Sequence, residues 1–173
     1  MIENERIILR AVEPADLDAL YIQENDPSKA ESSFTTAPLS RSQLWEYVNN
    51  YSADIFADKQ LRLMVVRRSD GATIGSVDVS DFDARDRRGF VGIFISKPFR
   101  RRGYASDALA LLSDYCRDTI GMHQLAAVVA ADNEASRSLF AKAGFKTCGR
   151  LQSWIRRGRH YADAIVYQLL FAN

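Results

Sequence analysis

Residues 90–120 constrain the fold more than any other part of the chain. The run FVGIFIS at 90–96 is almost continuously apolar, as in a strand that is buried on both faces. The basic loop KPFRRRG follows at 97–103, and from Ala105 onward apolar side chains recur at helical spacing until Gly121 can end the helix. A buried strand that is joined through a glycine to an amphipathic helix predicts an α/β fold.

Strands and helices are also expected on both sides of this unit. The dipeptide DG at 70–71 lies between two strand-like runs and is typical of a hairpin turn. Further strands are expected at 6–10, 124–130, 146–156 and 161–170. Helices are expected near 14–24, from a Ser40 cap to Ile55, and from Asp132 or Asn133 to Gly144, with a loop or broken helix at 26–40. This order predicts one sheet with helices on its faces.

The composition narrows the class of protein. With 173 residues, 47% of them apolar, the chain has the length and the core of a single domain, taken as 1–173. A formal net charge of +1 gives no strong attraction to nucleic acid or to anionic membranes. RNA binding by the clusters RDRR, FRRRG and IRRGRH is therefore the weaker alternative, and we expect no direct nucleic-acid binding and no membrane contact.

The first residues and the cysteines bear on location and on metal binding. MIENERIILR lacks the long apolar segment of a signal peptide, and no apolar run approaches the length of a membrane span. We therefore expect a cytoplasmic protein. Cys116 and Cys148 have no metal-type spacing, so neither a metal site nor a disulfide is expected.

The loop between the buried strand and the helix has the chemistry of an anion site. A helix N-terminus presents unpaired N–H groups and the positive end of the helix dipole. Gly103 lets an anion approach the backbone without a Cβ in the way, and the three arginines at 100–102 add charge-assisted hydrogen bonds. The Lys-Ser/Thr of an ATP-type loop and the glycine spacing of a dinucleotide fold are absent. A solvated basic loop with an ordinary capping glycine is the alternative.

Four segments in matching order resemble the GNAT N-acetyltransferases. Arg100-x-x-Gly103-x-Ala105 is similar to the acetyl-CoA pyrophosphate loop of that family, and DNEASRSLFAKAGF at 132–145 is similar to its Asn-x-x-Ser segment. RAVEPADLDALY at 10–21 and RRGRHYADAIVYQLL at 156–170 resemble the opening and the end of the subgroup that contains ribosomal-protein N-terminal acetyltransferases and spermidine acetyltransferases. Together these segments extend over nearly the whole chain.

The resemblance implies a fold and a co-substrate. The fold would be a GNAT-like mixed, mostly antiparallel twisted sheet of six to seven strands with flanking helices, in which strand 90–96 splays from strand 124–130. Acetyl-CoA would bind there without a metal, its pantetheine arm paired with the backbone of Phe94 and Ile95, and the Ile95 N–H would polarise the thioester carbonyl. The other implied donor-binding residues are Arg100, Arg101, Arg102, Gly103, Tyr104, Ala105, Ser106, Asn133, Ser136, Arg137 and Phe140, and Asn133 has helix capping as its alternative role.

Two departures from the family concern acid–base chemistry. Phe140 stands where many relatives carry a tyrosine that protonates the leaving thiolate, and Phe90 stands where relatives often carry a glutamate base. A thiol has a pKa near 8.5, so a missing acid is tolerable. Neutralising an amine of pKa about 10.4 at pH 7 costs about 4–5 kcal/mol, against about 1 kcal/mol for a protein α-amine. The sequence therefore favours an acceptor of low pKa.

Several polar and aromatic residues are candidates for the acceptor side. Asp81 is the candidate base, acting through water, while Glu24, Asp26 and Glu31 would form an acidic mouth for a cationic amine. A surface or capping role is the alternative for each carboxylate. His160 and Tyr161 lie in GRHYAD, and Phe34 and Trp154 would line the pocket, with core packing as the alternative for these two.

The resemblance and the residues together predict an acetyl-CoA-dependent N-acetyltransferase. A neutral primary amine, either a protein N-terminal α-amine or a small-molecule amine, would attack the thioester directly. Polyamine acetylation of the spermidine type and a non-catalytic acyl-CoA-binding protein are the alternatives. A homodimer is compatible with each of them.

Overall fold

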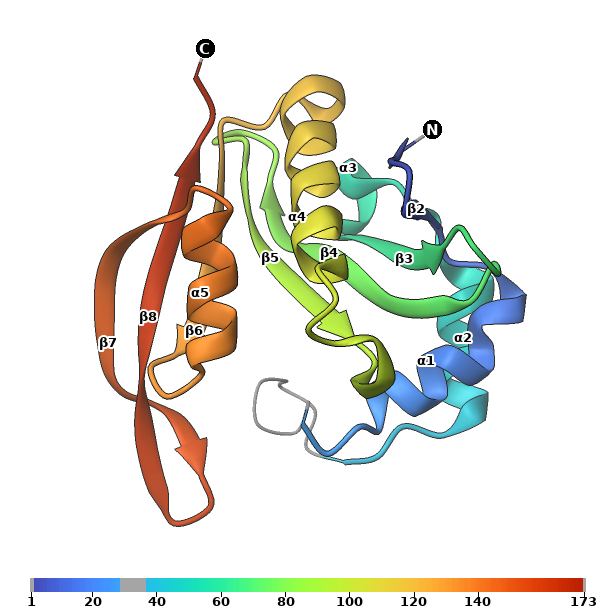
Figure 1. The fold of residues 1–173 in the computed structure, drawn as a ribbon, viewed down its shortest axis with the longest axis horizontal. Helices are drawn as coiled ribbons and strands as arrows, with labels where there is room; N and C mark the ends of the chain where they lie inside the picture. Colours follow the sequence, from blue (N-terminus) through green and yellow to red (C-terminus); the bar gives the residue numbers. More distant parts are fainter. Residues whose placement is uncertain (1, 29–36, 173) are drawn as a thin grey trace.

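The computed structural model describes residues 2–28 and 37–172, which form one sheet with helices on both faces (Figure 1). The eight strands lie in the order β1-β2-β3-β4-β5-β6-β8-β7, and β5 and β6 are the parallel neighbours. The sheet is mostly antiparallel, as predicted. It has more strands than the six to seven expected, because the short β1 (Ile2–Glu3) adds an edge beside β2.

Most elements lie within a few residues of the predicted segments. The remaining strands are β2 (Ile7–Ala11), β3 (Leu61–Arg67), β4 (Thr73–Asp83), β5 (Arg88–Ile95), β6 (Gln124–Ala130), β7 (Lys146–Arg157) and β8 (His160–Leu170). The helices are α1 (Leu17–Glu24), α2 (Arg41–Asn50), α3 (Ile55–Asp58), α4 (Tyr104–Tyr115) and α5 (Glu134–Lys142). Short 3-10 turns precede α1 and α4, and a π turn at Cys116–Ile120 extends α4 to Gly121.

Helix α2 is shorter than predicted. The apolar spacing suggested one helix as far as Ile55, but α2 ends at Asn50 and Ile55 begins the separate helix α3. Tyr51 leaves the helix because its hydroxyl bonds to the backbone of Arg62 in β3, donating to the carbonyl oxygen over 2.7 Å. Asp54 then caps α3 by accepting from the N–H of Phe56 over 2.9 Å.

The start of α2 carries the predicted Ser40 cap. The Ser40 hydroxyl accepts from the N–H of Gln43, and the Gln43 side chain accepts from the N–H of Ser40 over 2.9 Å. We expect Ser40→Ala to lower the free energy of unfolding by about 1 kcal/mol in urea titrations. Ser42→Ala, inside the same helix, is the control and should change stability by less than about 0.5 kcal/mol. Equal effects of the two substitutions would contradict the capping role.

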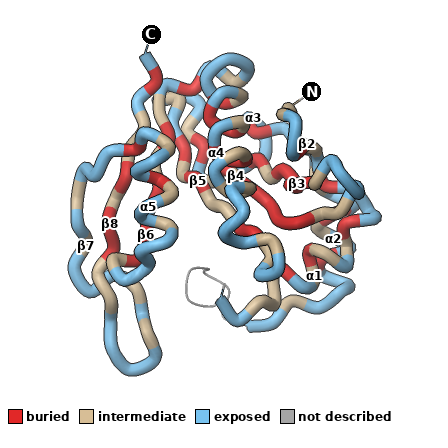
Figure 2. Tube along the Cα trace, viewed as in Figure 1, coloured by how far each residue is buried: buried red, intermediate tan, exposed pale blue. Residues whose placement is uncertain are grey.

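Alternate residues of β3 pack on opposite faces of the sheet. Leu63 and Val65 join the larger core with α4 and α5, whereas Met64 and Val66 pack with α1 and α2. Helices α4 and α5 therefore cover the same face, one beside β5 and the other beside β6 (Figure 1). Buried residues follow the central strands, and β7 contains no buried residue among those described (Figure 2). The junction of β5 and β6 thus lies between the two helices of one face.

Candidate active site

The parallel strands β5 and β6 pair over only three positions. Arg88, Gly89 and Phe90 are paired with Gln124, Leu125 and Ala126. Beyond Phe90, β5 remains paired with β4 and β6 remains paired with β8, so the two strands separate from one another. The predicted splay is confirmed. One edge of β5, from Val91 to Ile95, is left facing the opening, which we call the split.

The alternation of the ladder decides which backbone groups face the split. The N–H of Ser96 donates to the carbonyl oxygen of Ile74 over 2.8 Å, and the register places Phe94 opposite Ser76. Because N–H and C=O groups of an antiparallel strand point to alternate sides, the backbone of Phe94 faces β4. The backbones of Ile93 and Ile95 face the split. The prediction for Phe94 is therefore corrected, and the sequence had not identified Ile93.

Arg100 is turned toward the end of β5. Its Nε donates to the carbonyl oxygen of Ile95 over 2.6 Å, and its guanidinium lies 5.4 Å from the ring centroid of Phe94. A second guanidinium nitrogen donates to the hydroxyl of Ser28, in the segment after α1, over 3.2 Å. Of the three arginines predicted to bind phosphate, Arg100 forms hydrogen bonds within the protein, to Ile95 and Ser28, at the open end of the split.

The rest of the loop has the geometry of an anion site. Arg101 and Gly103 have φ values of +59° and +85°, so the backbone reverses sharply before α4 begins at Tyr104. The N–H groups of Tyr104, Ala105 and Ser106 precede the first α-helical hydrogen bond, from the N–H of Asp107 to the Gly103 carbonyl. Within the described residues, the exposed guanidinium groups of Arg101 and Arg102 form no ion pair. A pyrophosphate fits this combination of N–H groups and cations.

Helix α5 begins at the other side of the split. Asn133 caps it, since its Oδ1 accepts from the N–H of Ser136 over 3.0 Å, while its Nδ2 has no hydrogen-bond partner in the described part of the chain. Arg137 donates to the carbonyl oxygen of Ala131 over 3.0 Å. Asn133 therefore has the capping role that was its alternative, and its amide group can still donate to a ligand.

Phe140 is part of the core. It is 3% exposed and lies 5.1 Å from Phe145 and 6.2 Å from Tyr167, measured between ring centroids. Phenylalanine cannot donate a proton, so the position at which many relatives supply an acid supplies none in this chain.

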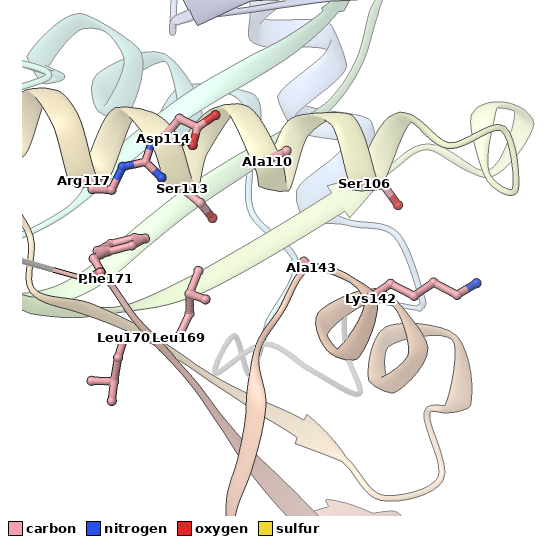
Figure 3. Close-up of a pocket in the computed structure, with 11 residues that line it drawn as sticks. Ser106, Ala110, Ser113, Asp114, Arg117, Lys142, Ala143, Leu169, Leu170 and Phe171 are labelled. Carbon is pink, nitrogen blue, oxygen red and sulfur yellow. Dashed lines mark ion pairs between the residues drawn. The ribbon is translucent and has the colours of Figure 1, made fainter.

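A groove of about 570 Å³ lies between α4, the end of α5 and the end of β8 (Figure 3). Ser106 and Lys142 lie on opposite sides of it, and Ser106 belongs to the first turn after the basic loop. The groove follows α4 as far as Arg117, which forms an ion pair of 2.8 Å with Asp114. Its walls are completed by Ala110, Ser113, Ala143, Leu169, Leu170, Phe171 and Ala172.

A charged cluster covers β4 and β5 on the face of the sheet that carries α1 and α2. Arg62 of β3 lies 2.9 Å from Glu24 of α1 and 3.9 Å from Asp78 of β4. Burial disfavours the charge of Arg62, but the carboxylates of Asp78 and Glu24 outweigh it and raise its pKa. Burial raises the pKa of the nearby Tyr47. Arg62 therefore joins α1 to β4 through two carboxylates.

Asp78 extends from this cluster over the strand that borders the split. It lies opposite Gly92 in the β4–β5 register, and a Cβ built on Gly92 would be 2.6 Å from its Oδ2. The side chain of Asp78 is 27% exposed, against 9% for Glu24. Asp78 was not predicted, although its alternation with Val77 and Val79 places it on the face away from α4. Glu24 is partly buried as the ion-pair partner of Arg62.

Asp81, the predicted base, lies far from the predicted oxyanion donor. Gly75 is the β4 residue opposite Ile95, so six positions, or about 20 Å at about 3.3 Å per residue, separate Asp81 from it. Asp81 is exposed in an irregular part of β4 with φ +49°. One bridging water cannot span that distance, so this assignment is corrected.

The other predicted acceptor residues are scattered. Trp154 and Tyr161 are 60% and 58% exposed on the β7–β8 hairpin, where His160 is exposed as well, so Trp154 is not a core residue. Arg157 ties this hairpin to Asp132, before α5, over 3.4 Å. Asp26 accepts from the hydroxyl of Ser28, which lowers its pKa. Glu31 and Phe34 lie outside the described residues.

Comparisons with known proteins agree with this geometry. Residues 6–146 match the family described as Acetyltransferase (GNAT) domain. The chain belongs to the GNAT family. It is 25% identical over 170 residues to an uncharacterized N-acetyltransferase, YoaA of Bacillus subtilis (strain 168), which covers 98% of this chain and 96% of that protein. The putative ribosomal N-acetyltransferase YdaF of the same organism is 23% identical, covering 96% and 92%.

Solved structures share the GNAT fold. A spermidine N-acetyltransferase from Vibrio cholerae, crystallised with CoA and spermine, superposes with a TM-score of 0.84 at 23% identity and covers 96% of both chains. A probable acetyltransferase superposes with a TM-score of 0.85 at 23% identity, covering 98% of this chain and 95% of the other. The family and the curated relatives make this GNAT protein an acyltransferase. In residues 2–28 and 37–172, no helix has both the length and the hydropathy to cross a membrane.

Proposed function

We propose that this protein transfers the acetyl group of acetyl-CoA to the nitrogen of a primary amine. The observation that carries the proposal is the unpaired edge of β5, which leads directly into the basic loop before α4. A strand edge that lacks a neighbour offers backbone hydrogen bonds to an extended ligand, and the loop offers N–H groups and cations to a pyrophosphate. These two features match the two ends of the donor.

The donor-binding residues follow from this arrangement. Arg101, Arg102 and the N–H groups of 103–106 would hold the pyrophosphate, while Asn133 would donate to the pantetheine arm. Ser106 and Lys142 would meet the nucleotide phosphates at the near end of the groove between α4 and α5. Acetyl-CoA bound in this way would supply an activated thioester beside the N–H groups of Ile93 and Ile95.

The chain's own residues would assist transfer mainly through the backbone. An N–H of Ile93 or Ile95 that points at the thioester oxygen stabilises the charge that develops there. The reaction forms one C–N bond and breaks one C–S bond, and the amine proton leaves with the thiolate or with solvent. Neither Phe140 nor Phe90 can move a proton. The proposed chemistry therefore needs an amine that reacts in its neutral form.

We propose that the acceptor approaches over Asp78. Asp78 lies over Gly92 of β5 and is more exposed than Glu24, the other carboxylate bound to Arg62, and a carboxylate suits an ammonium group. Phe90 and Phe140 supply neither a base nor an acid, which favours an α-amine, at about 1 kcal/mol to neutralise at pH 7, over a polyamine nitrogen, at about 4–5 kcal/mol. We propose the cytoplasm as the location, since acetyl-CoA is a metabolite of that compartment. The proposed reaction is compatible with a homodimer.

An acceptor screen tests this function. The protein is incubated with acetyl-CoA and, separately, with peptides carrying free N-termini, the same peptides with blocked N-termini, spermidine and an aminoglycoside. Release of free thiol and a gain of one acetyl group by mass are the readouts. We expect turnover with the free N-termini and none with the blocked ones. Turnover confined to spermidine would select the polyamine alternative, and tight CoA binding without any turnover would refute the enzymatic proposal.

A further inference from the structure

Arg6, which lies in the turn before β2, holds the basic loop from outside. Its NH1 donates to Oδ2 of Asp107 over 2.8 Å, and its NH2 donates to the carbonyl oxygen of Arg102. Its guanidinium lies 4.7 Å from the centroid of the Tyr104 ring. A Cβ built on Gly103 would be 3.0 Å from NH1. One side chain thus contacts Arg102, Tyr104 and Asp107, about one hundred residues away in the sequence.

The backbone of Arg6 is itself held by its neighbours. Its N–H donates to Oδ1 of Asn4 over 2.8 Å, and its carbonyl oxygen accepts from the N–H of Arg68 over 3.0 Å. From the adjacent strand β3, Arg67 places its guanidinium 4.8 Å from the ring centroid of Phe99, in the first half of the loop. Arg6, before the start of β2, and Arg67, at the end of β3, therefore support the loop at two points.

The loop needs such support because its backbone is unfavourable. Arg101 has φ +59°, a left-handed conformation that is unfavourable for a residue with a Cβ. Backbone hydrogen bonds hold the turn before it, from the N–H of Phe99 to the Ser96 carbonyl, and the helix after it, from the N–H of Asp107 to the Gly103 carbonyl. The carbonyl of Arg102, between these two, is bound by Arg6. A strained anion loop keeps its shape only when its surroundings impose it.

We propose that Arg6 is a positioning residue that keeps the loop in its anion-binding shape before the donor arrives. It acts through Asp107 and the Arg102 carbonyl, so the donor does not have to spend binding energy on ordering the loop. The inference rests on the proposed function of the loop as the pyrophosphate site.

Calorimetric titration with CoA tests the proposal. We expect Arg6→Gln to raise the Kd for CoA at least fivefold and to leave kcat at saturating acetyl-CoA within twofold of the original protein. Arg68→Gln is the matched control, because this neighbouring arginine pairs with Glu3 over 2.7 Å and does not contact the loop. It carries the same change in charge and should leave the Kd within twofold. An unchanged Kd in Arg6→Gln, even with a lower Tm, would overturn the proposal.

A double-mutant cycle separates positioning from direct contact with the donor. In an Asp107→Asn background, the effect of Arg6→Gln on the Kd should fall to less than half, because the two residues act together. An undiminished effect would mean that Arg6 binds CoA itself, which contradicts a positioning role. Arg6→Lys keeps the positive charge but cannot donate to Asp107 and to the Arg102 carbonyl at once. An Arg6→Lys protein that binds CoA as tightly as the original protein would therefore also contradict the positioning role. Failure of the original protein to bind CoA would instead refute the proposed function of the loop.

Discussion

Gly103→Val is expected to raise the KM for acetyl-CoA at least tenfold. The backbone of Gly103 has φ +85°, which a β-branched residue adopts only with strain. The new Cβ would also lie 3.0 Å from NH1 of Arg6, so the side chain that holds the loop would have to move. Both effects displace the N–H groups at the start of α4. Steady-state kinetics with varied acetyl-CoA measure the change.

Gly121→Val is the matched control at the other end of the same helical segment. Gly121 has φ +70°, and no atom outside its chain neighbours lies within 4 Å of a Cβ built there. The substitution should cost stability through similar backbone strain and leave the KM for acetyl-CoA within twofold. A KM that is unchanged in Gly103→Val, or raised equally in both variants, would show that the pyrophosphate binds elsewhere.

Asp78→Asn is expected to lower kcat/KM for the amine about thirtyfold and to leave the KM for acetyl-CoA unchanged. The reason is the loss of one charge-assisted hydrogen bond to the incoming ammonium group, about 2 kcal/mol. The exchange is nearly isosteric, and Arg62 retains its ion pair with Glu24, so the fold should persist. Kinetics with varied amine at saturating acetyl-CoA, together with a thermal melt, measure both quantities.

Asp81→Asn is the control for this prediction, since it makes the same change on the same strand at a distance from Ile95. It should alter kcat/KM by less than twofold. Gly92→Ala is a second variant, because its Cβ would lie 2.6 Å from Oδ2 of Asp78 and would push the carboxylate away. We expect Gly92→Ala to weaken amine turnover in the same direction. Loss of activity in Asp81→Asn with none in Asp78→Asn would reverse the assignment of the acceptor side.

The sequence predicted the elements whose signals are local. The apolar run of β5, the glycine before α4 and the Ser40 cap each depend on residues close together in the chain, and each lies where it was expected. The two halves of the proposed donor site depend on such local signals, because each is one strand followed by one helix. Helix α2 was predicted too long because the bond between Tyr51 and Arg62 joins the helix to a strand that periodicity does not consider.

The proposed acceptor side differs from the sequence prediction because its geometry depends on register. Asp81 and Asp78 are three residues apart in the sequence, and only the pairing of β4 with β5 shows that Asp78 lies over Gly92 while Asp81 lies about 20 Å from the residue opposite Ile95. The same alternation turns the backbone of Phe94 toward β4 and that of Ile93 toward the split. A shift of one position in either strand would exchange these roles.

The sequence by itself determined that this chain has a basic loop between a buried strand and an amphipathic helix, which predicts a site for a phosphorylated donor. The tertiary structure alone decided what holds that loop and which carboxylate lies over β5. Arg6, before β2, binds Asp107 in the first turn of α4, and Arg62 joins α1 to β4 through Glu24 and Asp78. Contacts between residues so far apart depend on strand order and register, which sequence periodicity does not specify.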